Sequence, residues 1–203
     1  AGDASMAFFT YWKYFLKMNY FDSLRVTNIL CSYLVTQMSN CIADKKVIHH
    51  IAFFVSCDLS DRNILSKISN NTPIIFANGC FDLLHKGHQF LFKQLEKMNG
   101  YVVIGLNSDK SVKLNKGQDR PIESQSIRMK KILKLGMINR VITFEEKTPI
   151  RLIKSIIPDI IVKGDEYKNS LVVGSSYIKK FRGETRFIKK YRNYSTTNIL
   201  NKK

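Results

Sequence analysis

The stretch FANGCFDLLHKGH, residues 76–88, decides the fold. It begins inside a short apolar run, residues 73–77, passes two glycines, and ends with His85 and His88. An apolar strand that leads through such a loop into a helix is typical of sheets that bind ligands beyond the carboxyl ends of their strands. We therefore expect the loop to lie at a sheet edge and a helix to begin near the histidines.

Strand-like runs alternate with helical patterns from residue 73 onward. The runs are residues 73–77, 101–106, 140–144, 160–163 and 185–190. The first, second and fourth are nearly continuous apolar segments, as in strands that are buried on both faces of a parallel sheet. The alternation predicts a doubly wound α/β domain with a five-stranded parallel sheet.

Two helical patterns between these runs have recognisable faces and ends. Residues 87–98 carry apolar side chains at helical spacing on one face. In residues 148–157, Thr148 is the expected cap, Pro149 occupies the first turn, and Pro158 stops the helix.

The front of the chain is predicted to be a small, mainly helical segment. Residues 3–18 and 22–38 are rich in apolar and aromatic side chains. Asp3 is the expected cap of the first helix, and Asp22 or Ser23 that of the second.

The next segment is less clear. Residues 40–58 are ambiguous, because VIHHIAFFV, residues 47–55, is also compatible with a strand. Residues 59–70 favour a short helix capped by Ser60.

The chain is strongly basic, with a net charge of +17 over 203 residues. Such a balance can indicate a polyanionic partner. However, Lys, Asn and Ile are abundant along the whole chain, and no compact Arg/Lys block with interleaved aromatics is present. We therefore expect no nucleic-acid partner.

The cysteines indicate neither a disulfide framework nor a zinc site. Cys31, Cys41, Cys57 and Cys80 form no C-x-x-C pair and have no zinc-type spacing. Free thiols favour a reduced, cytoplasmic protein. No apolar run reaches eighteen residues, so we expect no membrane span.

The residues of the 76–88 stretch suit a phosphate. Gly79 lets the backbone approach an anion closely, and Gly87 keeps the helix start free of a side chain. The helix N-terminus offers N–H groups, and His85 and His88 add hydrogen-bond donors. This set indicates phosphoryl or nucleotidyl transfer. The alternative is that both histidines only cap the helix and pack in the turn.

Residues 73–200 resemble the HxGH nucleotidyltransferases of the cytidylyltransferase-like superfamily. They are most similar to the adenylyltransferase domain of bifunctional ADP-heptose synthases. Besides the HxGH stretch, the resemblance includes residues 106–122, 144–167 and 194–200. It implies a Rossmann-like nucleotidyltransferase fold.

The resemblance implies catalytic roles for His85, His88 and Lys116. The histidines would stabilise the transition state at the α-phosphate of ATP, and Lys116 would neutralise phosphate charge. The implied nucleotide-binding residues are Asn78, Gly79, Cys80, Phe81, Asp82, Gly87, Lys113, Arg128, Ser195, Thr196 and Thr197. The implied substrate-binding residues are Asn107, Asp109, Lys163, Gly164 and Asp165.

Several of these roles have simpler alternatives. Lys113, Lys116 and Arg128 are also compatible with solvated charges in a lysine-rich chain. Ser195–Thr197, at the start of an expected last helix, would hold the β- and γ-phosphates, but an ordinary N-cap has the same composition.

The implied reaction transfers AMP from ATP to D-glycero-β-D-manno-heptose 1-phosphate. The products would be pyrophosphate and ADP-heptose, for the synthesis of the lipopolysaccharide core. Mg²⁺ would enter with ATP and bridge phosphates, without protein ligands. The resemblance also allows a homodimer.

This sequence departs from the heptose enzymes at some motif positions. KGDEY, residues 163–167, stands where they typically have KGGDY, so that Asp165 replaces a glycine. Asn193 replaces another glycine. Two other interpretations therefore stay open: a cytidylyltransferase that acts on a polyol phosphate, and a decayed, non-catalytic binding or dimerisation module.

The first residues, AGDASMAFF, resemble the anion hole of ribokinase-family sugar kinases. Asp3 would correspond to the sugar-hydroxyl base. We therefore expect residues 1–50 to be a kinase remnant, 51–70 a linker with a short helix, and 71–203 the nucleotidyltransferase domain. Two generic helices that begin with an Asp cap are the alternative for the front segment.

Overall fold

The computed structural model describes residues 2–15, 17–36, 44–57 and 61–189. The chain divides into two compact units, Ala1–Thr72 and Pro73–Lys203. Each unit is described by itself below.

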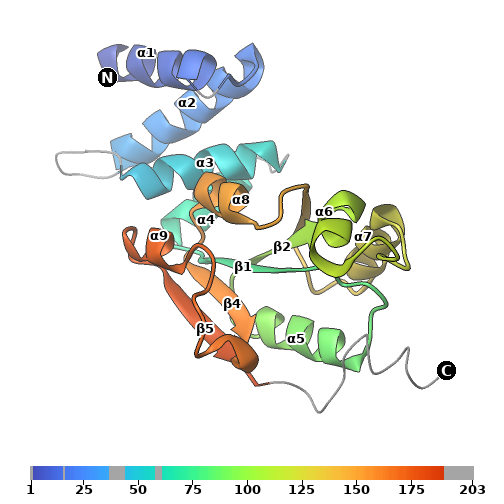
Figure 1. Ribbon diagram of the computed structural model, residues 1–203. Helices are drawn as coiled ribbons and strands as arrows, with labels where there is room; N and C mark the ends of the chain where they lie inside the picture. Colours follow the sequence, from blue (N-terminus) through green and yellow to red (C-terminus); the bar gives the residue numbers. More distant parts are fainter. Residues whose placement is uncertain (1, 16, 37–43, 58–60, 190–203) are drawn as a thin grey trace. The chain divides into compact units, whose positions relative to one another are not determined.

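The second unit contains the expected parallel sheet (Figure 1). Its strands in the described residues are β1 (Ile74–Gly79), β2 (Tyr101–Asn107), β3 (Arg140–Phe144), β4 (Ile160–Gly164) and β5 (Glu184–Ile188). All neighbouring strands are parallel, and their order is β3-β2-β1-β4-β5. The predicted fold class is therefore confirmed, with strand ends shifted by no more than two residues.

Helices cover both faces of this sheet, and Figure 1 shows α5 and α8 on opposite sides. The helical segments are α5 (Lys86–Glu96), α6 (Asp109–Lys116), α7 (Gln125–Lys134), α8 (Ile150–Ile156), the 3-10 turn η2 (Asp165–Tyr167) and α9 (Ser175–Lys179). Phe92 and Leu95 of α5 and Ile132 of α7 pack with Ile75 and Ile104 in one buried cluster. Successive strand residues point to opposite faces, so Ile74 and Phe76 are buried on the other side.

The expected start of α8 is wrong by one residue. Pro149, not Thr148, stands at the N-cap position, and no side chain makes a cap hydrogen bond there. The helix ends as expected before Pro158: Ile157 is left-handed, and its N–H donates to the carbonyl of Ile153.

The first unit is helical. It consists of α1 (Gly2–Thr10), the π-helical turn η1 (Tyr11–Phe15), α2 (Tyr20–Thr36), α3 (Lys45–Ser56) and α4 (Asp61–Ser69). Fully buried side chains, among them Trp12, Leu30, Phe54 and Ile64, form its interior. Residues 51–70, for which we expected a linker with a short helix, hold the second half of α3 and then α4, which is the expected short helix.

Two expectations for this unit require correction, and one ambiguity is resolved. The 3–18 helix is α-helical only to Thr10 and then becomes π-helical. The second helix begins at Tyr20, and Asn19 Oδ1 accepts from the N–H of Asp22 at 2.9 Å, so that Asn19 has the capping role expected of Asp22 or Ser23. VIHHIAFFV is helical, because its buried side chains share one helix face after a cap at Asp44. Ser60 lies outside the described residues.

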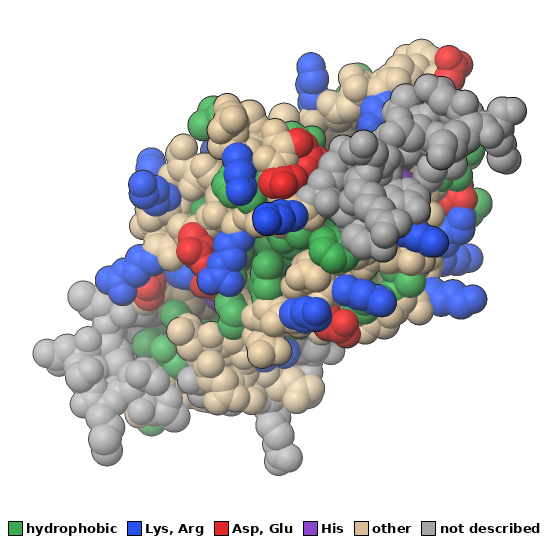
Figure 2. Space-filling model, turned by 90° about the horizontal axis from the view of Figure 1, so that it is seen from below, with side chains coloured by type: hydrophobic (Ala, Val, Ile, Leu, Met, Phe, Trp, Pro, Cys, Tyr) green, Lys and Arg blue, Asp and Glu red, His purple; other side chains and the backbone are tan. Residues whose placement is uncertain are grey.

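None of the helices in the described part of the chain is long and apolar enough to cross a membrane. Over the described side chains in Figure 2, Lys and Arg are interspersed with Asp and Glu and do not gather in one block.

The second unit should fold without the first. A truncated protein beginning near Asn70 contains the whole described sheet and the helices α5–α9 that cover it. We expect it to unfold in one cooperative transition, measured by circular dichroism at increasing temperature. An aggregated or molten product, with helical signal but no cooperative transition, would contradict this boundary.

Candidate active site

The site lies where the direction of the chain across the sheet reverses. From β1, the chain continues on one side of this strand through β2 to β3. It then crosses to the other side of β1, where β4 and β5 lie. Ligands in such sheets bind beyond the strand ends at this position. A cavity of about 580 Å³ is found there, lined by the ends of β1 and β4 and the start of α5.

The loop after β1 has an unusual backbone. Phe81 and Leu83 have φ values of 48° and 58°, in the left-handed region that costs an L-residue roughly 1 kcal/mol or more. The ring of Phe81, only 4% exposed, packs against Phe92 and the ring of His88, with both centroid distances 5.2 Å. A Cβ on Gly79 would lie 3.2 Å from this ring. Gly79 therefore makes room for Phe81.

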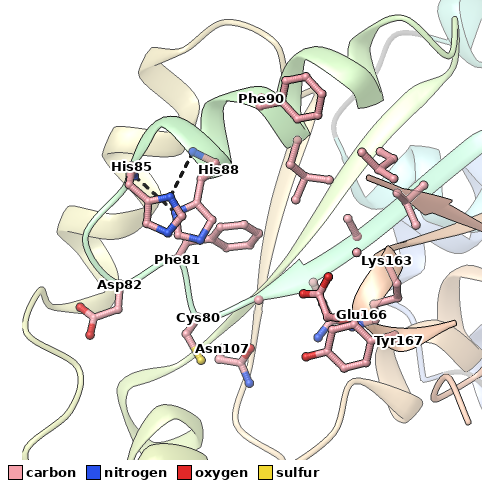
Figure 3. A pocket seen from close by; sticks show the side chains of 18 of the residues that line it. Cys80, Phe81, Asp82, His85, His88, Phe90, Asn107, Lys163, Glu166 and Tyr167 are labelled. Carbon is pink, nitrogen blue, oxygen red and sulfur yellow. Dashed lines mark hydrogen bonds between the residues drawn. The ribbon is translucent and has the colours of Figure 1, made fainter. Parts of the chain in front are cut away.

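His85 and His88 cap the start of α5 (Figure 3). His85 Nδ1 accepts from the N–H of Gly87 at 3.1 Å, and His88 Nδ1 accepts from the N–H of His85 at 3.4 Å. The two rings are stacked, with centroids 3.8 Å apart. The capping interpretation of these histidines is thus correct, yet both rings also line the cavity.

Capping sets the hydrogen-bonding character of both rings. A neutral imidazole whose Nδ1 accepts a hydrogen bond carries its proton on Nε2. This tautomer follows from the hydrogen-bond partners. Capping and phosphate binding therefore use different atoms: Nδ1 holds the helix start, and Nε2–H is the donor for an anion.

His88 is neutral at physiological pH. Burial, followed by repulsion from His85 and Lys116, lowers the pKa of His88 to about 3. A nearby phosphate would therefore meet a neutral N–H donor at this position.

The lowered pKa has a consequence for acid stability. Between pH 6.5 and about 3, the unfolded chain binds a proton at His88 that the folded protein does not, so the free energy of unfolding falls as pH drops through this range. An Asn side chain keeps an acceptor near Nδ1 but does not titrate. When the pH is lowered from 7.5 to 5, the free energy of unfolding should fall in both proteins. We expect this fall to be roughly 1–2 kcal/mol smaller in His88→Asn than in the wild type, measured by urea denaturation. Equal losses in the two proteins would show that His88 is not buried as a neutral ring.

Lys116 in α6 and Lys147 in the loop after β3 are among the lysines that line the cavity. Lys116 is exposed at the end of α6 and lines it, as expected. Lys113, in the same last turn of α6, is not among the described residues that do so. Lys147 also lines the cavity, and our sequence analysis missed it. Asn115 Nδ2 donates to the carbonyl of Lys147 at 3.2 Å, and Ser111 Oγ donates to that of Glu146 at 2.6 Å, so α6 holds this loop.

The end of β4 forms the opposite wall, as Figure 3 shows. Lys163 Nζ donates to Asn78 Oδ1 at 2.7 Å and lies 5.4 Å from the ring centre of Tyr167. Burial lowers the pKa of Lys163, and the Glu166 carboxylate partly opposes this shift. Glu166 and Tyr167 line the cavity, whereas Asp165 does not appear among its described lining residues. Asp165 also does not have a positive φ, so replacement of the glycine strains no described turn.

Two expected nucleotide ligands are buried and bound to protein. The Asp82 carboxylate accepts from Arg120 Nη1 at 2.7 Å and from the N–H groups of Ile122 and Glu123, at 3.0 and 3.1 Å to Oδ1. Arg128 is 0% exposed and does not line the cavity with the other described residues. Its Nη2 donates to Asp109, which is likewise absent from that lining.

The structure thus brings most of the expected site residues together. Those at the cavity are Asn78, Gly79, Cys80, Phe81, Asp82, His85, Gly87, His88, Asn107, Lys116, Lys163 and Gly164. Ser195, Thr196, Thr197 and Asn193 lie outside the described residues. Asp3 lies in α1 of the first unit.

The family model of the cytidylyltransferase-like proteins matches residues 76–202. The sheet order, the cavity at its switch point and the histidine pair at the start of α5 define a nucleotidyltransferase-type domain. With the match to the family model, the chain belongs to the cytidylyltransferase-like family.

Two curated relatives carry the name "bifunctional protein HldE". That of Campylobacter fetus subsp. fetus is 35% identical over 190 residues, which are 92% of this chain and 41% of that protein. That of Helicobacter pylori is 36% identical over 181 residues, 89% of this chain and 38% of that protein. The chain thus spans about two fifths of the length of these relatives.

A solved structure, described as the lipopolysaccharide core biosynthesis protein from Thermoplasma volcanium GSS1, is also similar. It is 26% identical and covers 61% of this chain and 98% of its own, with a TM-score of 0.48.

Proposed function

We propose that the second unit transfers AMP from ATP to a sugar 1-phosphate and releases pyrophosphate. The observation that carries this proposal is the pair of capping histidines, whose tautomers aim N–H donors rather than lone pairs at an anion. The acceptor we propose is D-glycero-β-D-manno-heptose 1-phosphate, and its support is the similarity to the HldE proteins. The product would serve lipopolysaccharide core synthesis in the cytoplasm, where ATP is available.

The proposed chemistry is an in-line displacement. An oxygen of the acceptor phosphate attacks the α-phosphorus of ATP, the bond from that phosphorus to the β-bridging oxygen breaks, and pyrophosphate leaves with the electron pair. Charge grows on the α-phosphate oxygens in the transition state, where the imidazole N–H donors and the Lys116 ammonium stabilise it. Burial raises the pKa of the nearby Cys80 thiol, which keeps it protonated and a poor nucleophile.

The donor set fits a metal that enters with its substrate. Within the described residues, no group of three or more His, Cys, Asp or Glu side chains could hold a metal ion. The phosphate side of the cavity carries imidazoles and lysines, which suit phosphate oxygens and not Mg²⁺. Mg²⁺ would enter with ATP, held by the nucleotide and not by these side chains, and would supply charge neutralisation.

The two ends of the cavity suit different parts of the substrates. His85, His88, Lys116 and Lys147 supply donors and positive charge for phosphates. Lys163 and Gly164 at the end of β4, and Asn107 at the end of β2, offer ammonium, backbone and amide groups for sugar hydroxyls or a base. We keep these three as proposed substrate ligands, and Ser195–Thr197 as proposed phosphate ligands.

Residues 1–50 are proposed to derive from a ribokinase-like domain, supported by the AGDASMAFF stretch alone. The name of the HldE relatives, "bifunctional", is compatible with this proposal.

A matrix of nucleotides and acceptors tests the proposed function. Pyrophosphate release is measured with ATP or CTP, each combined with heptose 1-phosphate or glycerol 3-phosphate, in the presence of Mg²⁺. We expect release only with ATP and heptose 1-phosphate. Release with CTP and the polyol phosphate would favour the cytidylyltransferase. No release from any pair, in a protein that is folded, would favour the decayed module.

A further inference from the structure

Arg128 is fully buried and connects four parts of the second unit. Its Nε donates to the Glu123 carbonyl at 2.9 Å, and its Nη1 donates to the Cys80 and Asn107 carbonyls at 2.5 and 2.8 Å. Its Nη2 donates to Asp109 Oδ1 at 2.7 Å. Four of the five N–H groups of a guanidinium therefore have protein acceptors.

These acceptors stand at the places that build the cavity. Cys80 is the first residue after β1, Asn107 the last of β2, and Asp109 the first of α6, the helix that carries Lys116. Charge-assisted bonds from a planar guanidinium have fixed directions. One side chain thus sets the spacing of two strand ends and the start of a helix.

The loop that Arg128 holds is the one with the left-handed residues. Phe81 and Leu83 keep their positive φ only because neighbouring groups fix the chain around them. Arg128 fixes the loop at Cys80, and the buried Asp82 carboxylate fixes it again through Ile122 and Glu123. The loop then leads directly to His85.

We propose that Arg128 is a positioning residue, which aims His85, His88 and Lys116 and does not touch the nucleotide. This differs from the phosphate contact that the family resemblance implies. The readout in turnover rests on the proposed adenylyl transfer, whereas the labelling readout below does not.

Kinetics of Arg128→Lys separate the two roles. Lysine keeps the charge but lacks the fork that reaches both carbonyls. If Arg128 positions the donors, kcat should fall roughly 10- to 100-fold while the KM for ATP and the inhibition constant of pyrophosphate stay within about threefold. A raised KM for ATP with kcat preserved would indicate a phosphate contact and overturn the proposal. Unchanged kinetics in a folded variant would overturn it equally.

Labelling of Cys80 tests whether Arg128 holds the loop after β1, and it does not depend on turnover. Its thiol is half-buried on the loop that Arg128 holds. The rate of reaction with a chromogenic disulfide is measured in wild type and Arg128→Lys, with Cys80→Ala in each background to subtract the other thiols. We expect Cys80 to react several-fold faster in Arg128→Lys, because the loop opens more often. An equal labelling rate in the two proteins would show that Arg128 does not hold this loop.

The matched control is Arg151→Lys, an exposed arginine on α8 whose described partner is Glu146. It should leave both readouts unchanged. If Arg128→Lys fails to fold, Asp109→Asn decides, because the Asp109 side chain is 43% exposed and Asn keeps an Oδ1 acceptor for Arg128 Nη2 while it removes the counter-charge. Asp109→Asn should lower kcat, leave the KM for ATP unchanged and speed the labelling of Cys80. An unchanged kcat or an unchanged labelling rate would overturn the proposal. If the wild type transfers no nucleotide, the proposed function fails, while the labelling result still stands or falls by itself.

Discussion

His88→Ala is expected to lower kcat by about 10²-fold or more, the scale for loss of one preorganised donor to a transition state. The ring lines the cavity, and its Nδ1 is used by the helix cap, so the catalytic contribution comes from Nε2–H. The alanine variant also loses the cap and the contacts with Phe81 and His85, and we expect its unfolding temperature to fall by a few degrees. Initial rates at saturating ATP and acceptor measure the effect.

Two isosteric variants separate the donor from the cap. Asn keeps an acceptor near Nδ1 and lacks a donor near Nε2, whereas Gln places an amide N–H near Nε2 and gives up the cap. We therefore expect His88→Asn to be as slow as His88→Ala but more stable, and His88→Gln to retain part of the turnover. Near-wild-type turnover in a folded His88→Asn protein would refute the catalytic assignment.

Lys116→Ala is the second large effect we expect. Its ammonium is the charge at the end of α6 that lines the cavity. Removal of a cation that faces a phosphate on which charge grows should lower kcat/KM roughly 10²-fold, and Lys116→Arg should recover part of the loss.

Lys113→Ala is the informative comparison, since Lys113 lies in the same last turn of α6. Because it does not belong to the described cavity lining, we expect kcat/KM to change by less than about threefold. A loss equal to that of Lys116→Ala would show that the bound triphosphate extends beyond this cavity. Lys130→Ala, exposed on α7, controls for net charge.

The strands were predictable because parallel strands buried on both faces leave continuous apolar runs, such as YVVIGL in β2. The histidine motif was predictable because its residues are neighbours in the sequence. VIHHIAFFV was ambiguous because it is also a short, continuous apolar run, and such a run does not distinguish a buried strand from a buried helix. Its helix is set by tertiary packing around Phe54.

The rest of the site depends on contacts that no local pattern contains. Lys147 reaches the cavity because Ser111 and Asn115, more than thirty residues earlier, bind its loop. Arg128 resembles an ordinary charged helix residue in the sequence, and only the fold brings the carbonyls of Cys80 and Asn107 to its guanidinium. The helix pattern offered its position on an otherwise apolar face with Ile132, and the family resemblance pointed to a phosphate contact instead.

The turn η2 after β4 contributes side chains of its own to the cavity wall. Its residues Glu166 and Tyr167 are exposed, and Lys163 Nζ bound to Asn78 links the strand before the turn to β1. KGDEY replaces KGGDY there without a change in length and without a positive φ at Asp165. A side-chain exchange in this turn can therefore alter the part of the cavity wall formed by Glu166 and Tyr167 and leave the loop held by Arg128 and Asp82 unchanged.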